Sequence, residues 1–205
     1  MIQLLDIAEV IGTVAFAFSG FLVAGSVGLD LLGIFIAAFL TALGGGVIRD
    51  IIADKALFAF TNNIAAVLVI TVVIFGIFFK LHRYSEIEKN RLFLFADTLG
   101  LVAFAISGAV TGCEAHFNFF GVVLLALVTA TGGGVLRDIL INRVPFILTH
   151  EFYGTVTLVV GIAIYLLDRF ATLGFVQITL IFVGGVILRL VAHRYGWHLP
   201  VLHRK

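Results

Sequence analysis

The sequence predicts an all-α integral membrane protein with seven transmembrane helices, arranged as an inverted 3+3 repeat plus one extra helix. The first observation is composition: 61% of the 205 residues are hydrophobic and 12% are charged, whereas about 25% of the residues in soluble domains are charged. The second is length, because spans of roughly 20 apolar residues leave room for about six to eight helices. The third is a gapless internal repeat.

Polar or turn-forming residues divide the apolar sequence into segments of membrane-spanning length. Asp30 follows the first segment, Asp54 and Lys55 follow the second, a charged run at 80–91 follows the third, and Pro145 follows the fifth. Pro145 fits a loop because its nitrogen carries no hydrogen-bond donor. The first segment has no basic n-region, so it is expected to be a span and not a signal peptide. The predicted helices are 5–25, 31–53, 63–80, 92–112, 119–141, 152–167 and 173–191.

The second half of the chain repeats the first half at an offset of 88 residues. TALGGGVIRDI at 41–51 and TATGGGVLRDI at 129–139 share nine of 11 residues. GTVAFAFSG at 12–20 and GLVAFAISG at 100–108 share seven of nine. Chance matching would give only a few identities, so the chain contains a duplicated unit.

The repeat divides one membrane domain, 1–205, into three parts. Residues 1–84 and 89–172 are predicted to be three-helix repeats, and 173–205 would be the seventh helix and a tail. An odd number of spans per repeat inserts the second copy upside down relative to the first. Inverted repeats of this kind place their sites near the midplane of the bilayer.

Lys and Arg are distributed unevenly between the two sides of this predicted domain. One side would carry only Lys55 and Arg169. Because cytoplasmic loops are enriched in these residues, the N-terminus is expected outside and the C-terminus in the cytoplasm. The basic tail is expected to meet anionic lipid headgroups there. The nine residues on the cytoplasmic side would be Lys80, Arg83, Lys89, Arg91, Arg143, Arg189, Arg194, Arg204 and Lys205.

Two glycine triplets are the candidate pore elements. Each glycine lowers helix propensity by about 1 kcal/mol relative to alanine, so the second and fifth helices are predicted to bend or break open there. A break is tolerated only inside protein or beside a wet cavity, where freed carbonyl groups bind cations. The alternative is that the triplets pack helices closely. The candidate residues are Gly44, Gly45, Gly46, Gly132, Gly133 and Gly134.

An arginine and an aspartate follow each triplet, as Arg49-Asp50 and Arg137-Asp138. A charge within a span costs several kcal/mol, by order of magnitude, and usually faces the interior or a water path. By the inversion, the two arginines would bracket a central path. The alternative is that each Arg-Asp pair is a snorkelling helix end with a structural ion pair.

Two further pairs of polar residues align across the repeat. Glu9 and Asp97 could form a negative vestibule that concentrates cations, or could interact with the positive end of a helix dipole. Ser19 and Ser107 could line the path, or could bond back to a carbonyl one turn earlier. The residues alone leave both choices open.

Several classes of function find no support in the sequence. The net charge is +1, and no basic stripe indicates nucleic-acid binding. Cys113 is the only cysteine, which excludes an intrachain disulfide and a thiolate metal cluster. Motifs of hydrolases, zinc proteases and nucleotide-binding loops are absent from the sequence. We therefore expect neither an enzyme nor a cofactor or resident metal, only permeant monovalent cations.

The seven helices, the 3+3+1 repeat and the doubled Gly-Gly-Gly-x-x-Arg-Asp motif resemble the prokaryotic members of the trimeric intracellular cation (TRIC) channel family. The same family is also catalogued as bacterial glycine transporters. The resemblance implies a homotrimer with one pore per protomer, helices kinked at the glycine triplets, and Arg49 and Arg137 as charged pore residues. Animal members pass potassium across internal membranes.

The resulting prediction is a channel for monovalent cations, potassium and sodium, in a bacterial inner membrane. The first alternative is a secondary transporter for glycine or another small amino acid. Inverted repeats and broken helices also occur in transporters, and an arginine could bind the substrate carboxylate with two hydrogen bonds. The second alternative is a membrane scaffold that transports nothing.

Overall fold

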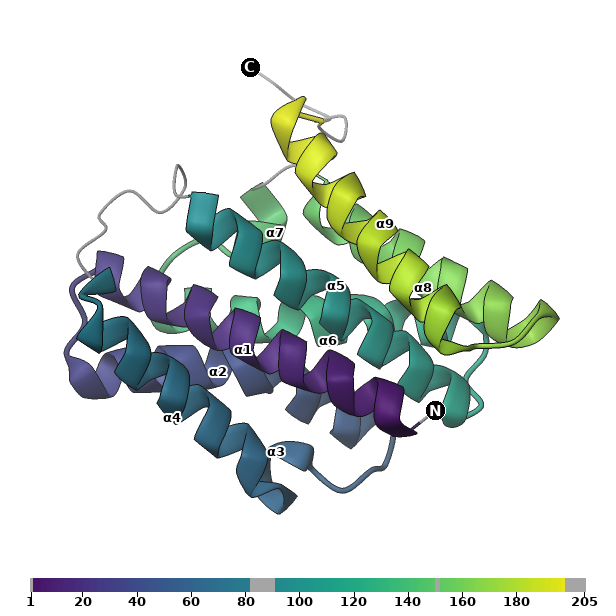
Figure 1. Cartoon of the computed structure of the whole chain (residues 1–205), viewed down its shortest axis with the longest axis horizontal. Helices are drawn as coiled ribbons and strands as arrows, with labels where there is room; N and C mark the ends of the chain where they lie inside the picture. Colours follow the sequence, from purple (N-terminus) through teal and green to yellow (C-terminus); the bar gives the residue numbers. More distant parts are fainter. Residues whose placement is uncertain (1, 82–90, 150–151, 198–205) are drawn as a thin grey trace.

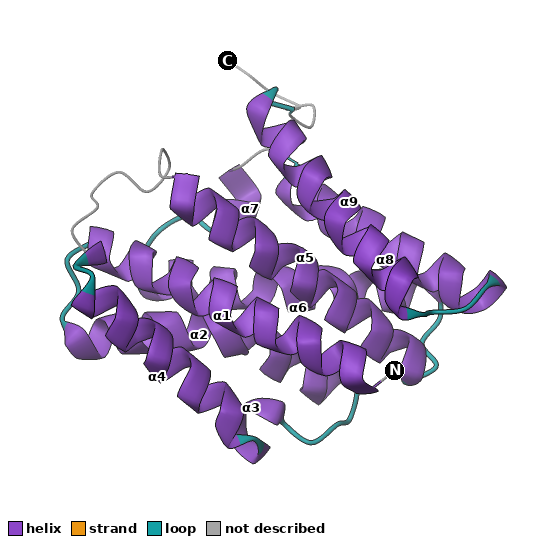
Figure 2. Cartoon of the chain, in the orientation of Figure 1, coloured by secondary structure: helices purple, strands orange, loops and turns teal. Residues whose placement is uncertain are grey.

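The computed structural model describes residues 2–81, 91–149 and 152–197, and the regular structure within these ranges is helical (Figure 2). Seven of the described helices correspond to the predicted segments, and two four-residue helices, α3 and α7, were not predicted. The helices are α1 (Ile2–Ser26), α2 (Leu31–Ile52), α3 (Phe58–Thr61), α4 (Asn63–Phe78), α5 (Arg91–Glu114), α6 (Phe119–Leu140), α7 (Phe146–Thr149), α8 (Tyr153–Phe170) and α9 (Phe175–Arg194).

Six of the described helices are long and apolar enough to cross a membrane, namely α1, α2, α5, α6, α8 and α9. The remaining long segment, α4, is apolar but has only 16 residues. The outer faces of α4 and α9 are rich in exposed apolar side chains such as Val67, Ile74, Leu180 and Ile187. Exposed apolar faces on helices of this length are those of an integral membrane protein.

The core is built from the first two helices of each repeat. α1 packs against α2 and α5, and α6 also packs against α2 and α5 (Figure 1). The third long helix of each repeat flanks this group: α4 contacts α1 and α2, and α8 contacts α5 and α6. α9 lies outside, against α5 and α8 (Figure 1).

Two pairs of equivalent helices have bounds that match at the repeat offset, and the equivalent helices of the core run antiparallel. Both ends of α2 and α6, and both ends of α3 and α7, differ by the offset of 88 residues. On α1 and α5, Glu9 faces Ser107 while Ser19 faces Asp97, so one helix rises as the other descends. α2 and α6 are related in the same way, because Gly45 lies against Thr129 and Gly133 lies against Thr41.

The expected break at the glycine triplets is not present. α2 is one continuous helix across Gly44–Gly46, and α6 is continuous across residues 132–134. The physical reason is close packing between the two helices, which holds the backbone helical at the positions of lowest propensity. Tertiary packing supplies most helix stability in proteins, and it outweighs about 1 kcal/mol per glycine.

The basic residues used to predict the orientation are found in different environments. Arg189, which was counted on the cytoplasmic side, lies within α9, and its exposed fraction is 1%. Lys80, Arg91, Arg143 and Arg194 are exposed near helix ends. Arg83, Lys89, Arg204 and Lys205 lie outside the described residues.

Candidate functional site

The first polar cluster, here called the Arg49 cluster, consists of Arg49, Asp50, Glu9 and Ser107. The exposed fraction of Arg49 is 5%, so its guanidinium group does not reach the surface as a snorkelling side chain would. Its Nη1 donates to the Glu9 carboxylate and to the Ser107 hydroxyl. Its Nε and Nη2 donate to Asp50 Oδ1 at 2.9 Å and 2.6 Å. Ser107 in turn donates to Glu9 at 2.5 Å.

The second cluster, the Arg137 cluster, consists of Arg137, Asp138, Asp97 and Ser19. The exposed fraction of Arg137 is 2%. Its Nε donates to Asp138 Oδ1 at 2.8 Å, and its Nη1 donates to the Ser19 hydroxyl at 3.3 Å. Ser19 donates to Asp97 Oδ1 at 3.2 Å. Each chain of hydrogen bonds therefore runs from an arginine through a serine to an acid.

The two clusters are the same arrangement with the repeats exchanged. Arg49 of the first repeat bonds Ser107 of the second, and Arg137 of the second repeat bonds Ser19 of the first. Neither serine bonds back to a carbonyl of its own helix in the hydrogen bonds described, which was one of the alternatives. Each cluster needs both repeats, so the duplicated motif builds one joint core and not two separate sites.

The two aspartates also fix the short helices that the sequence did not predict. Asp50 Oδ2 accepts from the backbone N–H of Phe58 at 2.9 Å, at the start of α3. Asp138 Oδ2 accepts from the backbone N–H of Phe146 at 2.9 Å, at the start of α7. A carboxylate at a helix N-terminus satisfies backbone donors and complements the helix dipole. Each Arg-Asp motif therefore includes a structural ion pair. This agrees with part of the alternative interpretation of the motif, but the pair is buried and does not snorkel to the surface.

Glu9 and Asp97, expected in an open vestibule, are buried members of these clusters. Glu9 and Ser19 are ten residues apart on α1, which places the clusters about 15 Å apart along the helix axis. Between them, the rings of Phe16 and Phe104 meet at a centroid distance of 5.4 Å. These two phenylalanines are themselves repeat equivalents, 88 residues apart.

The six glycines of the triplets have different surroundings. A β-carbon added at Gly45 or Gly133 would lie well under 3.0 Å from a backbone carbonyl oxygen of the other helix. At Gly44 or Gly132 it would lie 2.7 Å or 3.0 Å from the end of a side chain across the crossing. At Gly46 and Gly134 its nearest contacts, at 3.9 Å and 3.8 Å, are the guanidinium groups of Arg49 and Arg137. The middle glycine of each triplet is therefore the one required for close approach.

The sequence analysis missed two residues beside the Arg137 cluster, Tyr153 and Arg189. The Arg189 guanidinium carbon lies 5.0 Å from the centroid of the Tyr153 ring. Asp97 interacts electrostatically with Arg189 and forms a hydrogen bond with the Tyr153 side chain. The available signal was an arginine near the end of an apolar helix, but its partners come from α5 and α8 and are distant in sequence.

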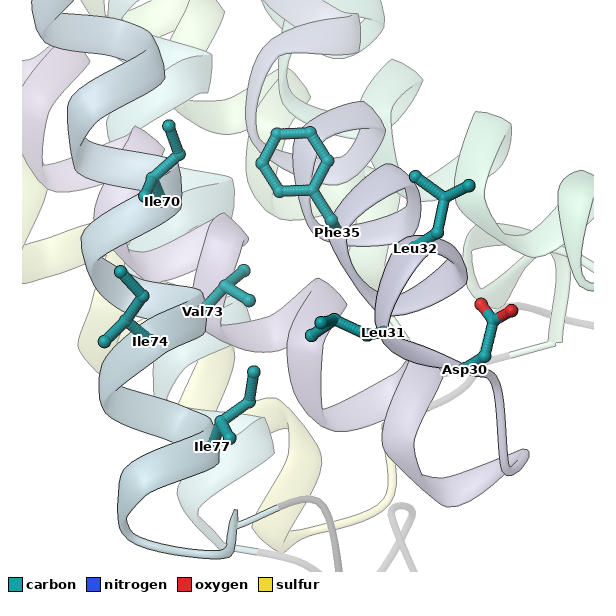
Figure 3. A pocket seen from close by; sticks show the side chains of 8 residues that line it. All are labelled: Asp30, Leu31, Leu32, Phe35, Ile70, Val73, Ile74 and Ile77. Atoms are coloured by element: carbon teal, nitrogen blue, oxygen red, sulfur yellow. The ribbon is translucent and has the colours of Figure 1, made fainter.

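A large apolar groove lies away from both clusters, between α2 and α4 (Figure 3). Its volume is about 670 Å³; Phe35, Ile70 and Ile74 line it, and Asp30 lies at one end. Its lining does not include any residue of the Arg49 or Arg137 cluster. Among the described residues, no group of three His, Cys, Asp or Glu side chains is placed to hold a metal ion.

Comparison with known proteins relates the chain to membrane proteins. Residues 6–81 and 94–169 each match the family model described as glycine transporter. The chain is 31% identical to the UPF0126 membrane protein YvgT of Bacillus subtilis, over 95% of both chains. It is also 31% identical to the UPF0126 inner membrane protein YadS of Escherichia coli K12, over 75% of this chain and 74% of that one.

Solved structures share the whole fold. A structure determined to explain conductance through TRIC cation channels has a TM-score of 0.86 and 34% identity, with 98% of both chains covered. The TRIC trimeric intracellular cation channel orthologue from Rhodobacter sphaeroides has a TM-score of 0.85 and 27% identity, with 94% of this chain and 98% of that chain covered. The matched proteins are membrane and channel proteins, not enzymes. The chain therefore belongs to the prokaryotic TRIC channel family, whose sequence model is the one described as glycine transporter.

Proposed function

We propose that this protein is a channel for monovalent cations, potassium and sodium, with one conduction path inside each protomer of a homotrimer. The path would run through the core of α1, α2, α5 and α6 and pass both polar clusters. The observation that carries the proposal is the pair of buried charged clusters, built from equivalent positions of the two repeats at two depths of one core. The names of the solved neighbours, TRIC cation channels and a trimeric orthologue, support it.

Charge and oxygen chemistry in the core favour cations. Buried charges in a membrane domain mark ion or substrate paths, because placing them in hydrocarbon costs several kcal/mol by order of magnitude. The hydroxyl groups of Thr13 and Thr98 are buried and have no hydrogen-bond partner within the described part of the chain. Hydroxyl and carboxylate oxygens are the ligands that hard cations take. A dehydrating cation would thus find oxygen ligands beside both clusters.

The described conformation leaves little open space beside the Arg49 cluster. The cavity lined by Glu9, Arg49 and Phe58 has a volume of about 10 Å³. A single water needs about 10 to 15 Å³, so a hydrated cation does not fit there. Phe104 also lines this cavity, and its ring contacts that of Phe16 between the clusters. Hydrophobic constrictions of this kind gate by dewetting, and conduction would require these rings or helices to move.

The proposed setting is a bacterial inner membrane, in which α4 also crosses the membrane, as the third of seven spans along the chain, and the N-terminus is periplasmic. The Escherichia coli relative is named an inner membrane protein. Lys80, Arg91, Arg143 and Arg194 would then lie on the cytoplasmic side, where basic side chains interact with anionic headgroups. The antiparallel course of equivalent helices supports an inverted repeat.

Glycine transport is the second candidate, favoured by the description of the family model. A substrate carboxylate could bind an arginine with two hydrogen bonds. However, Arg49 is already bound by the carboxylates of Glu9 and Asp50, and Arg137 is bound by Asp138. A substrate would have to displace a buried counter-charge, whereas a cation would interact with the acids directly. This difference favours the channel.

Flux measurements in proteoliposomes decide between the candidates. The purified protein would be tested for potassium movement without an added ionophore and, in the same preparation, for uptake of radiolabelled glycine. The channel predicts fast, non-saturating potassium flux without glycine uptake. Saturable glycine uptake driven by an ion gradient would establish the transporter, and the absence of both fluxes would favour a scaffold. Native mass spectrometry of the same sample tests the homotrimer.

A further inference from the structure

We propose that the groove between α2 and α4 binds an acyl chain of a phospholipid whose head group carries a primary amine, such as phosphatidylethanolamine. The groove has a volume of about 670 Å³. It is open to the outer surface of the helix bundle, because Leu31 and Ile74 in its walls are 65% and 61% exposed. Among the described residues that line it, Asp30 is the only charged one.

The walls of the groove are apolar side chains from both helices. Leu31 and Phe35 point from α2 toward α4, and Val73 points from α4 toward α2 (Figure 3). In a bilayer this opening is accessible to acyl chains, which are as apolar as leucine. A chain inside the groove touches protein on two sides, and dispersion contacts add up with the number of neighbouring atoms. The groove therefore holds a chain more closely than a flat helix face does.

In the second repeat, the equivalent pair of helices is packed more closely. Gly161 of α8 occupies the position equivalent to Val73 of α4, 88 residues later. A β-carbon at Gly161 would lie only 3.0 Å from the Ala126 β-carbon, so α8 lies directly against α6. The valine side chain at this position in α4 prevents the same approach to α2.

Protein side chains also fill the mouth of the equivalent space. The rings of Phe119 and Tyr165 meet edge to face, with their centroids 5.2 Å apart. Their equivalents in the first repeat are Leu31 and Ile77, which line the groove. The second repeat thus shows that a large apolar group fits between these two helices, and the first repeat supplies no such group of its own.

The carboxylate of Asp30 favours a head group that carries a primary amine. Its Oδ1 accepts from the backbone N–H of Gly33 at 2.7 Å and caps α2. Its Oδ2 makes no hydrogen bond within the described part of the chain, and the residue is exposed. A primary ammonium group can donate to this oxygen, whereas an anionic head group would be repelled. The charge is not needed for the cap, because Asn118 caps α6 in the same way.

A lipid fits this groove better than a second copy of the chain does. An apolar helix laid over the groove would cover the Asp30 carboxylate without supplying a cation, and an unpaired charge in a protein interface is costly. A phospholipid supplies the ammonium group and leaves it at the water boundary. In the proposed orientation α2 begins at the cytoplasmic side, so this lipid would belong to the cytoplasmic leaflet.

Photolabelling tests the site directly. The purified protein in detergent would be mixed with phosphatidylethanolamine that carries a diazirine in its acyl chain or, separately, with phosphatidylglycerol that carries the same chain. Mass spectrometry of the digested protein then locates the label. We expect label within 31–35 and 70–77. Phosphatidylethanolamine should label these segments about threefold to fivefold more than phosphatidylglycerol, as one exposed ion pair allows.

Asp30→Asn tests the choice of head group. Asparagine retains the helix cap and removes the charge, so both lipids should label the groove to the same extent. Asp54→Asn is the matched control, because Asp54 is an exposed acid beyond the other end of α2. It should keep the preference of the wild-type protein for phosphatidylethanolamine.

The combination of Leu31→Phe with Ile77→Tyr tests the place of the chain. It copies the ring pair of the second repeat into the groove and should abolish groove labelling by both lipids. The matched control combines Leu180→Phe with Ile187→Tyr, which adds the same bulk to exposed positions of α9. This control should be labelled in the groove as the wild-type protein is.

Equal labelling of the wild-type groove by both lipids would show ordinary contact with the bilayer and would overturn the proposal. Absence of label from 31–35 and 70–77 would overturn it as well. In that case, a change of oligomeric mass in the ring-pair variant would assign the groove to a second copy of the chain. If the ring-pair variant does not fold, the wild-type protein and Asp30→Asn decide the question. Ion flux enters none of these measurements, so this proposal and the proposed function can fail independently.

Discussion

Gly45 of α2 and Gly133 of α6 lie at the crossing of the two helices, each against a backbone carbonyl of the other helix. A β-carbon on Gly45 would overlap the Thr129 carbonyl oxygen, and one on Gly133 would overlap that of Thr41. The distance between these central helices is therefore set by the absence of two β-carbons. The glycine triplets allow the backbones of α2 and α6 to approach each other closely, and they do not interrupt either helix.

Gly45→Ala and Gly133→Ala should push α2 and α6 apart and destabilise the protein. Overpacking of a close contact costs typically about 1–3 kcal/mol, and here the obstacle is backbone, which yields less than a side chain. We expect a lower Tm in detergent and a reduced potassium flux. Gly46→Ala and Gly134→Ala are the matched controls, since their β-carbons meet the nearest atoms at ordinary contact distances. Equal Tm values for Gly45→Ala and Gly46→Ala would contradict this role of the crossing.

Asp50→Asn should destabilise the fold more than removal of an exposed carboxylate. Asp50 neutralises buried Arg49 and accepts a hydrogen bond at the start of α3. Breaking a buried ion pair typically costs about 3–5 kcal/mol. Asp30→Asn is the control, because Asp30 caps α2 from an exposed position and asparagine caps about equally well. Thermal unfolding monitored by size-exclusion chromatography compares the two; similar losses would refute the assignment.

Phe16→Ala should open the constriction between the clusters and increase resting potassium flux. Removing the ring eliminates its contact with Phe104 and leaves a space at the centre of the core. A stability loss of about 3–5 kcal/mol is expected as well, so the flux must be normalised to the amount of folded protein. Phe60→Ala is the control, since Phe60 is 73% exposed on α3. Unchanged flux per amount of folded protein in Phe16→Ala would exclude this ring as the gate.

The ion pair of Lys55 and Glu114 should contribute little to the free energy of unfolding. Its atoms are 2.7 Å apart, but both side chains are partly exposed, and pairs of this kind contribute about 0–1 kcal/mol. Glu114→Gln is expected to change Tm far less than Asp50→Asn. A large Tm loss in Glu114→Gln would show that this contact holds the end of α5 against the segment after α2.

The internal repeat made most of the fold predictable. Because the offset is constant, identifying one helix located its equivalent, and the long helices agree with the predicted segments within a few residues. Arg49 and Arg137 are buried, as expected of charges that face the interior of a membrane domain, and their place beside an ion path stays a prediction. The break at the glycines was wrong because local propensity was weighed without the neighbouring helix. In a membrane, unsatisfied backbone groups cost several kcal/mol by order of magnitude, and an intact helix avoids that cost.

Arg189 could not be assigned from the sequence for a different reason. It lies two residues before the end of the predicted helix 173–191, at a position where arginine commonly reaches a headgroup. Its burial depends on Tyr153 and on how α9 lies against α5 and α8. The short helices α3 and α7 were missed similarly, because their start depends on aspartates eight residues earlier.

Each cluster takes its serine from the other half of the chain, and this has an evolutionary consequence. A single ancestral unit could complete no cluster by itself, because its arginine would lack the serine that the second copy supplies. Two copies of that unit would have had to insert in opposite orientations and associate. Gene duplication and fusion would then fix the antiparallel pair within one chain. Only after fusion could the halves diverge, and an appended helix carrying Arg189 could make one end of the molecule different from the other.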